Sequence, residues 1–107
     1  MYKVVLVNFP FTEKTETKSR PVLLLTNGSY GRHKIILIAY ITSKDPENIP
    51  SEVKIHKSAK NMLKKNSIIK LHKIANIPEY AVRGELGELT RKESDEVKTK
   101  LKKLFGL

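Results

Sequence analysis

Hydrophobic residues along the chain fall into short runs separated by polar segments. The runs that predict strands are Tyr2 to Phe9, Pro21 to Thr26, Ile35 to Ile41, Glu52 to His56 and Ser67 to Lys73. The run Ile35 to Ile41 is continuously apolar and rich in β-branched residues, which is typical of a strand covered on both faces. We therefore expect it to be the central strand of a sheet.

A helix is expected near the end of the sequence. Thr90 and Glu93 have the spacing of a capping box, in which each residue satisfies a backbone group of the other. Apolar residues then recur at helical spacing: Val97, Leu101, Leu104 and Phe105. Gly106 suits the left-handed position that ends a helix. Short strands followed by one helix predict a mainly β fold, a small barrel with a C-terminal helix.

Polar segments connect the predicted strands. The segment from Pro10 to Arg20 is too hydrophilic to pack and long enough to be a functional loop. Between His56 and Ser67 we expect a loop or a single turn of helix. The 107 residues suffice for one hydrophobic core, so residues 1–107 are expected to form a single domain.

The sequence favours a soluble, cytoplasmic protein. It contains no cysteine, so nothing calls for an oxidising compartment. The first apolar run is too short for a signal peptide, and the longest one is far too short to span a membrane.

Positive charge dominates the composition. The 21 Lys and Arg residues exceed the 11 Asp and Glu residues and give a net charge of +10, more than solubility requires. Val53 to Lys73 contains seven lysines and no carboxylate, a pattern typical of a surface that follows phosphates. A solvated face, or a composition adapted to heat, is the alternative interpretation. A membrane surface is a less suitable partner, because the lysines lack an accompanying apolar face.

Two polar residues end neighbouring predicted strands. If the strands on either side of the Asn27 to Lys34 turn form a hairpin, pairing Asn27 with Ile35 places Arg20 opposite Thr42. Cross-strand partners lie about 5 Å apart. We therefore expect a site where these strand ends meet, beside the polar loop.

The residue types at this site suit phosphate binding. Arg20 precedes a proline, which restricts it to extended backbone, and a guanidinium makes two-pronged contacts with phosphate. Thr42 and Ser43 add hydroxyl donors. Taken singly, Arg20 also fits a surface ion pair and Thr42 an ordinary strand end.

No metal and no cofactor is expected. His33, His56 and His72 lack metal-ligand spacing, and neither a phosphate-binding glycine loop nor a nucleophile elbow is present. His72 is either an acid, a base or a phosphate contact, or simply a polar strand residue. RNA cleavage makes few demands of the protein, because the 2'-hydroxyl of the substrate is the nucleophile.

Five segments in order resemble the MazF/PemK toxins of toxin-antitoxin systems. They are Val4 to Thr12, Ser19 to Leu25, Ala39 to Lys44, Ser67 to Ile74 and Leu86 to Thr90, which together cover nearly the whole chain. The resemblance implies an SH3-like barrel with a C-terminal helix, usually a homodimer. It also implies an endoribonuclease that cuts single-stranded RNA without metal and is neutralised by the acidic tail of a cognate antitoxin.

The resemblance also implies roles for particular residues. Catalysis maps onto Arg20 and Thr42, with Ser43, Glu16 and His72 as candidate supporting groups. Five lysines are expected to contact RNA: Lys14, Lys18, Lys44, Lys70 and Lys73. The alternative function is a non-catalytic binding protein on the same fold, because related barrels poison DNA gyrase by contact, and an inactive RNA-binding member is also conceivable.

Overall fold

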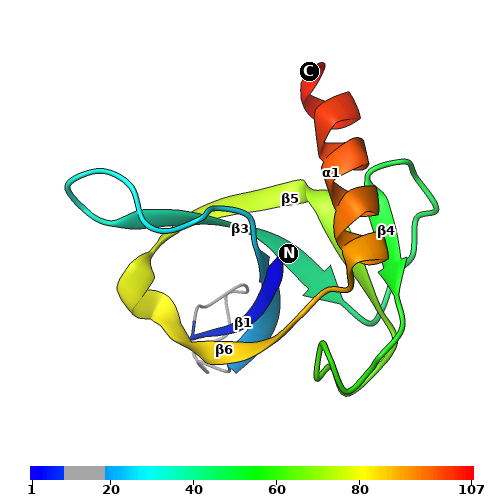
Figure 1. Cartoon of the computed structure of the whole chain (residues 1–107), viewed down its shortest axis with the longest axis horizontal. Helices are drawn as coiled ribbons and strands as arrows, with labels where there is room; N and C mark the ends of the chain where they lie inside the picture. Colours follow the sequence, from blue (N-terminus) through cyan, green and yellow to red (C-terminus); the bar gives the residue numbers. More distant parts are fainter. Residues whose placement is uncertain (9–18) are drawn as a thin grey trace.

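Six strands and one C-terminal helix make up the computed structural model of the chain, which describes residues 1–8 and 19–107 (Figure 1). The strands are β1 (Lys3–Asn8), β2 (Ser19–Leu24), β3 (Ile35–Thr42), β4 (Glu52–Ile55), β5 (Ser67–Pro78) and β6 (Val82–Glu88). A short 3₁₀ turn, η1 (Glu79–Ala81), joins β5 to β6, and α1 (Arg91–Phe105) follows. The predicted mainly β fold with a C-terminal helix is confirmed.

All six strands belong to one antiparallel sheet in the order β4-β5-β3-β2-β1-β6. The sheet curls into a ring, and α1 stands beside β4 and β5 with its C-terminal end projecting away from the strands (Figure 1). Among the described strands β4 and β6 are the two edges, so the barrel is not strictly closed.

Each face of the sheet carries its own hydrophobic cluster. Ala39 belongs to a cluster that includes Val97 of α1, whereas its neighbour Ile38 belongs to a cluster that includes Ile77 and Ala81. Successive strand residues point to opposite faces, so β3 is covered on both faces as its apolar run predicts. Leu37 is the exception, because it remains partly exposed.

The strand β5 is longer than predicted and bends in the middle. It continues past Lys73 to Pro78. Its pairing with β3 jumps from Lys70 opposite Tyr40 to Ile74 opposite Ala39. The intervening residues form an irregularity of the kind that redirects side chains near functional sites.

Sequence reasoning missed β6. Its sequence, VRGELGE, contains two glycines, which weaken strand propensity, and only two large apolar residues. One glycine is required by a neighbouring loop: a Cβ at Gly87 would overlap the carbonyl oxygen of Lys60 and lie 2.8 Å from the carbonyl carbon of Asn61. The signal for this strand therefore depends on residues far away in the sequence.

The loop between β4 and β5 contains one hydrogen-bonded turn of the helical i to i+4 type, in which the N–H of Met62 donates to the carbonyl oxygen of Ser58. The single turn that the prediction allowed is therefore present within an otherwise irregular loop. Asn61, fully buried, holds this loop together. Its side-chain oxygen accepts from the N–H groups of Ser58 and Leu63, and its amide nitrogen donates to the carbonyl of His56.

The helix begins and ends as predicted. The capping box of Thr90 and Glu93 is formed, and Gly106 ends the helix with φ 70°. Val97 is buried, but the last apolar residues, Leu104 and Phe105, are exposed. In the described chain no helix is both long and apolar enough to cross a membrane.

We expect Gly87→Ala to lower the free energy of unfolding by about 1 to 3 kcal/mol, because the added methyl must push backbone atoms aside. Urea denaturation measures the change. Gly84→Ala on the same strand is the control, since a Cβ there meets nothing within 4 Å. Equal stability of the two variants would contradict this account.

Candidate active site

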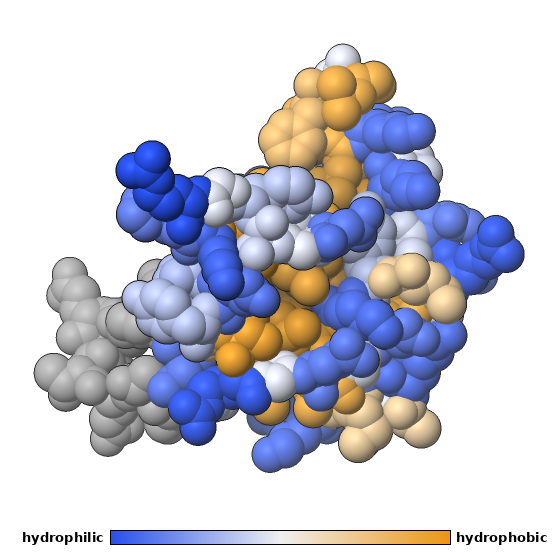
Figure 2. Space-filling model, turned by 60° about the vertical axis from the view of Figure 1, so that its left-hand side comes forward, coloured by the Kyte–Doolittle hydropathy of each residue, from blue (hydrophilic) through white to orange (hydrophobic). Residues whose placement is uncertain are grey.

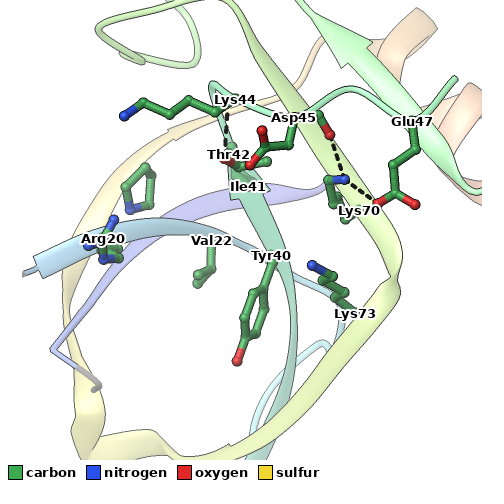
Figure 3. A pocket seen from close by; sticks show the side chains of 11 residues that line it. Arg20, Val22, Tyr40, Ile41, Thr42, Lys44, Asp45, Glu47, Lys70 and Lys73 are labelled. Atoms are coloured by element: carbon green, nitrogen blue, oxygen red, sulfur yellow. Dashed lines mark hydrogen bonds and ion pairs between the residues drawn. The ribbon is translucent and has the colours of Figure 1, made fainter. Parts of the chain in front are cut away.

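A pocket of about 310 Å³ opens where β2, β3 and β5 lie side by side (Figure 3). Its charged lining residues are Arg20, Lys44, Asp45, Glu47, Lys70 and Lys73, and the others are Pro21, Val22, Tyr40, Ile41 and Thr42. Arg20 from β2 and Lys73 from β5 lie on opposite sides of Tyr40 and Val22 (Figure 3).

The structure brings Arg20 and Thr42 into the lining of this one pocket. The ladder between β2 and β3 pairs Val22 with Tyr40 and Leu24 with Ile38, the register that places Arg20 level with Thr42. The turn differs from the expectation, because Ile35 bridges to Tyr30 and not to Asn27. The pairing of β2 with β3 ends at Val22, and Arg20 pairs with β1 on the other side of β2.

The hydroxyl of Thr42 is oriented by the chain that follows it. Its Oγ1 accepts a hydrogen bond of 3.2 Å from the backbone N–H of Lys44. Because one lone pair is used in this way, the hydroxyl hydrogen is directed elsewhere and is suited to donate to an anionic oxygen.

Three exposed cations line the pocket. Arg20, Lys44 and Lys73 are exposed and form no ion pair with any residue in the described parts of the chain. Unpaired cations that line a concave surface concentrate positive potential there. The pocket is therefore suited to a polyanion.

Lys70 lines the pocket but is held in a buried ion pair. It is only 3% exposed, and its Nζ lies 2.9 Å from Oε2 of Glu52 and 2.7 Å from Oε1 of Glu47. The same Nζ donates to the carbonyl oxygen of Asp45 at 2.9 Å. Lys70 is thus a buried, ion-paired residue of the pocket lining, and its contact with RNA stays a prediction.

The buried pair changes the protonation behaviour of its members. Hydrogen bonds to Glu47 and Glu52 raise the pKa of Lys70 above its ordinary value. The hydrogen bond from Lys70 lowers the pKa of Glu52, and the backbone N–H groups of Glu47 and Asn48 lower it further. The charged forms of both partners are therefore favoured.

Other predicted site residues lie elsewhere. Ser43 is exposed and does not line the pocket. His72 lies outside the lining, with its Nδ1 2.8 Å from the hydroxyl of Ser51 and its Nε2 3.9 Å from Glu47. Glu16, Lys14 and Lys18 lie outside the described residues.

Sequence reasoning missed Tyr40, Asp45 and Glu47 as lining residues. The only available signal was their position, since Tyr40 lies two residues before Thr42 and the two acids lie in the polar segment after it. Within the residues that the structure describes, no group of three histidine or acidic side chains has the arrangement of a metal site.

The family model of the PemK-like, MazF-like toxins of type II toxin-antitoxin systems matches residues 1–105. The chain belongs to this family. The comparison with curated protein sequences finds no match.

Solved structures of MazF proteins have the same fold. The Mycobacterium tuberculosis toxin MazF-mt6 is 20% identical with a TM-score of 0.74, and the alignment covers 98% of this chain and 97% of that one. MazF from Deinococcus radiodurans is 22% identical with a TM-score of 0.69, covering 98% and 94%. A mycobacterial endoribonuclease in complex with its cognate antitoxin is 19% identical with a TM-score of 0.74, covering 98% and 92%.

We expect the buried pair of this MazF-like protein to make its stability sensitive to acid. Because Lys70 lowers the pKa of Glu52, the stabilisation from Glu52 is complete above the ordinary glutamate pKa of about 4.3 and is lost as the pH falls through the lowered value. The raised pKa of Lys70 gives the opposite dependence, with loss only in strong alkali.

Urea denaturation of the wild type and of Glu52→Gln between pH 7 and pH 3 tests this. The stability difference between them should be largest at pH 7 and shrink below about pH 4. Glu85→Gln, at an exposed glutamate paired with Lys3, is the control and should change little at any pH. A stability difference between wild type and Glu52→Gln that stays constant across this range would contradict the assignment.

Proposed function

We propose that this MazF/PemK family member is a metal-independent endoribonuclease that cleaves single-stranded RNA. The observation that supports the proposal is the meeting of Arg20 and Thr42 in a pocket that is also lined by the exposed cations Lys44 and Lys73. A guanidinium and a hydroxyl donor suit the two non-bridging oxygens of a phosphodiester.

In the proposed reaction the 2'-oxygen of the substrate attacks the adjacent phosphorus. The P–O bond to the 5'-oxygen of the next nucleotide breaks, the 2'-hydroxyl loses its proton and the departing 5'-oxygen gains one. The products are a 2',3'-cyclic phosphate and a 5'-hydroxyl. Arg20 holds the phosphate and stabilises its added negative charge, while Thr42 donates a hydrogen bond to it.

Lys44 and Lys73 are proposed to hold the RNA backbone on either side of the reacting phosphate. Both are exposed and line the pocket. The same cations suit an acidic antitoxin, which we propose as the protein partner because family members act within toxin-antitoxin systems. RNA and antitoxin then compete for one positive surface.

We expect purified wild-type protein to cut single-stranded RNA in the presence of EDTA. Arg20→Ala should lower the rate by about 100-fold or more, the usual effect of removing one group that stabilises transition-state charge. Arg32→Ala, at an exposed arginine outside the pocket lining, is the matched control and should retain activity. Gel analysis of a labelled oligonucleotide measures both.

Equal cleavage by wild type and Arg20→Ala would overturn the catalytic assignment. Inhibition of gyrase supercoiling with intact RNA would instead support the alternative, a non-catalytic binding protein on the same fold.

We also propose that two copies associate through the exposed apolar end of α1. Leu104 is 42% exposed, Phe105 58% and Leu107 89%. Figure 2 shows hydrophobic atoms crowning this end of the helix and continuing down the same face. Such a patch is costly to leave in water, and a two-fold dimer pairs it with itself.

Phe105→Glu should therefore shift the protein from dimer to monomer, because it places a charge in the proposed apolar contact. Sedimentation velocity at micromolar concentration measures the change. Tyr80→Glu is the control, since Tyr80 is an even more exposed aromatic residue on η1, away from the helix. A wild type that sediments as a monomer, or a Phe105→Glu variant that remains dimeric, would contradict this surface.

A further inference from the structure

A buried ion pair lies behind the wall of the pocket. Glu52 of β4 and Lys70 of β5 are directly opposite each other in the strand pairing, and they are only 4% and 3% exposed. Burial of a charge is costly unless it is paired and fully hydrogen bonded. Here all three N–H groups of the Lys70 ammonium have an acceptor, from Glu52, Glu47 and the carbonyl of Asp45.

The Glu52 carboxylate holds the loop that follows β3. Its oxygens accept from the backbone N–H groups of Glu47 and Asn48 at distances of 2.9 to 3.2 Å. Two residues of this loop have left-handed backbone, Asp45 with φ 61° and Asn48 with φ 56°. Asp and Asn tolerate this conformation better than most residues, but side chains anchored in the sheet fix it.

The same loop forms one side of the pocket. It leaves β3 at Thr42 and supplies Lys44, Asp45 and Glu47 to the lining (Figure 3). The backbone N–H that orients the Thr42 hydroxyl belongs to Lys44, one residue before the carbonyl that Lys70 holds. The anchors at Asp45 and Asn48 therefore fix the chain immediately after the proposed phosphate donor.

We propose that Lys70 and Glu52 are positioning residues, which act through the loop at residues 43–48 and not on the RNA. This inference rests on the proposed cleavage of RNA at Arg20 and Thr42. Glu52 is the clearer case of the two, because its side chain does not line the pocket. It nevertheless accepts the hydrogen bonds that shape the loop at the pocket wall.

The competing possibility is that Lys70 contacts a phosphate directly, as its place among the lining residues suggests. Two carboxylates already neutralise its charge, and a phosphate would have to displace Glu47, the more exposed of them. The two possibilities predict different results for Glu52→Gln. If Lys70 contacts a phosphate, loss of the Glu52 carboxylate frees its ammonium and tightens RNA binding. If Glu52 and Lys70 anchor the loop, the same substitution slows the chemical step.

We expect Glu52→Gln and Lys70→Met each to lower kcat by tenfold or more with less than threefold change in KM. Their double variant should be no slower than the slower single variant, because both substitutions disrupt the same ion pair that anchors the loop. Lys73→Gln is the comparison for a direct contact. It should raise KM and reduce the slope of log affinity against log salt by about 0.7, the value for one phosphate contact on a single strand. Lys70→Met should leave that slope unchanged.

A matched control separates positioning from loss of stability. Asn61→Ala removes a buried polar side chain that holds a different loop, outside the pocket. It should lower the unfolding temperature without changing kcat per folded molecule. If Lys70→Met does not fold, Lys70→Arg keeps the charge and should retain more activity than Glu52→Gln.

Hydrogen exchange of the RNA-free protein tests the anchoring of the loop independently of cleavage. Peptides covering residues 43–50 should exchange faster in Glu52→Gln and Lys70→Met than in the wild type. In Asn61→Ala their exchange rate should be unchanged. Absence of RNA cleavage by the wild type would overturn the proposed function but leave this measurement intact. Unaltered exchange, an unchanged kcat in Glu52→Gln, or a reduced salt slope in Lys70→Met would each overturn the positioning role.

Discussion

The burial of β3 on both faces is the constraint from which the site follows. Ile38 and Ala39 pack into different hydrophobic clusters, so a slip of one residue against β2 would send every side chain of the strand to the wrong face. The core therefore fixes the register between β2 and β3. The same register sets Arg20 level with Thr42 at the ends of the two strands, so packing in the core determines geometry at the surface.

The opposite wall of the pocket is held by charge and not by apolar packing. After Thr42 the chain leaves the sheet and returns only at Glu52, and the residues between them are exposed except for Ser51. Burial of apolar side chains therefore gives this segment no reason to adopt a single conformation. The buried pair of Glu52 and Lys70 provides one, because each unsatisfied hydrogen bond around a desolvated charge would be costly.

Much of the fold could be predicted because its signals are local. The run Ile35 to Ile41, the capping box at Thr90 and the Gly106 stop each lie within a few residues of the element they define. The strand β6 could not be predicted, because the glycine at position 87 is required by the close approach of the backbone at Lys60 and Asn61, which are distant in the sequence. Its polar residues are explained by a distant partner as well, because Glu85 and Glu88 pair with Lys3.

The site was predictable to a similar degree. The placement of Arg20 and Thr42 followed from the hairpin, while the environment of Lys70 did not. The lysine-rich run begins at Val53, one residue after the carboxylate that neutralises Lys70. A count along the sequence therefore treats this lysine like Lys73, although one is buried opposite Glu52 and the other is exposed.

The two kinds of lysine imply two separable contributions to the proposed reaction. Exposed cations such as Lys44 and Lys73 attract any polyanion, and salt or an acidic protein competes for them. The buried cation is shielded from both, because its three hydrogen bonds stay within the protein. An acidic antitoxin that covers the exposed cations would block RNA without disturbing the anchored loop. The pocket would then keep its catalytic shape while inhibited, ready to act as soon as the partner is removed.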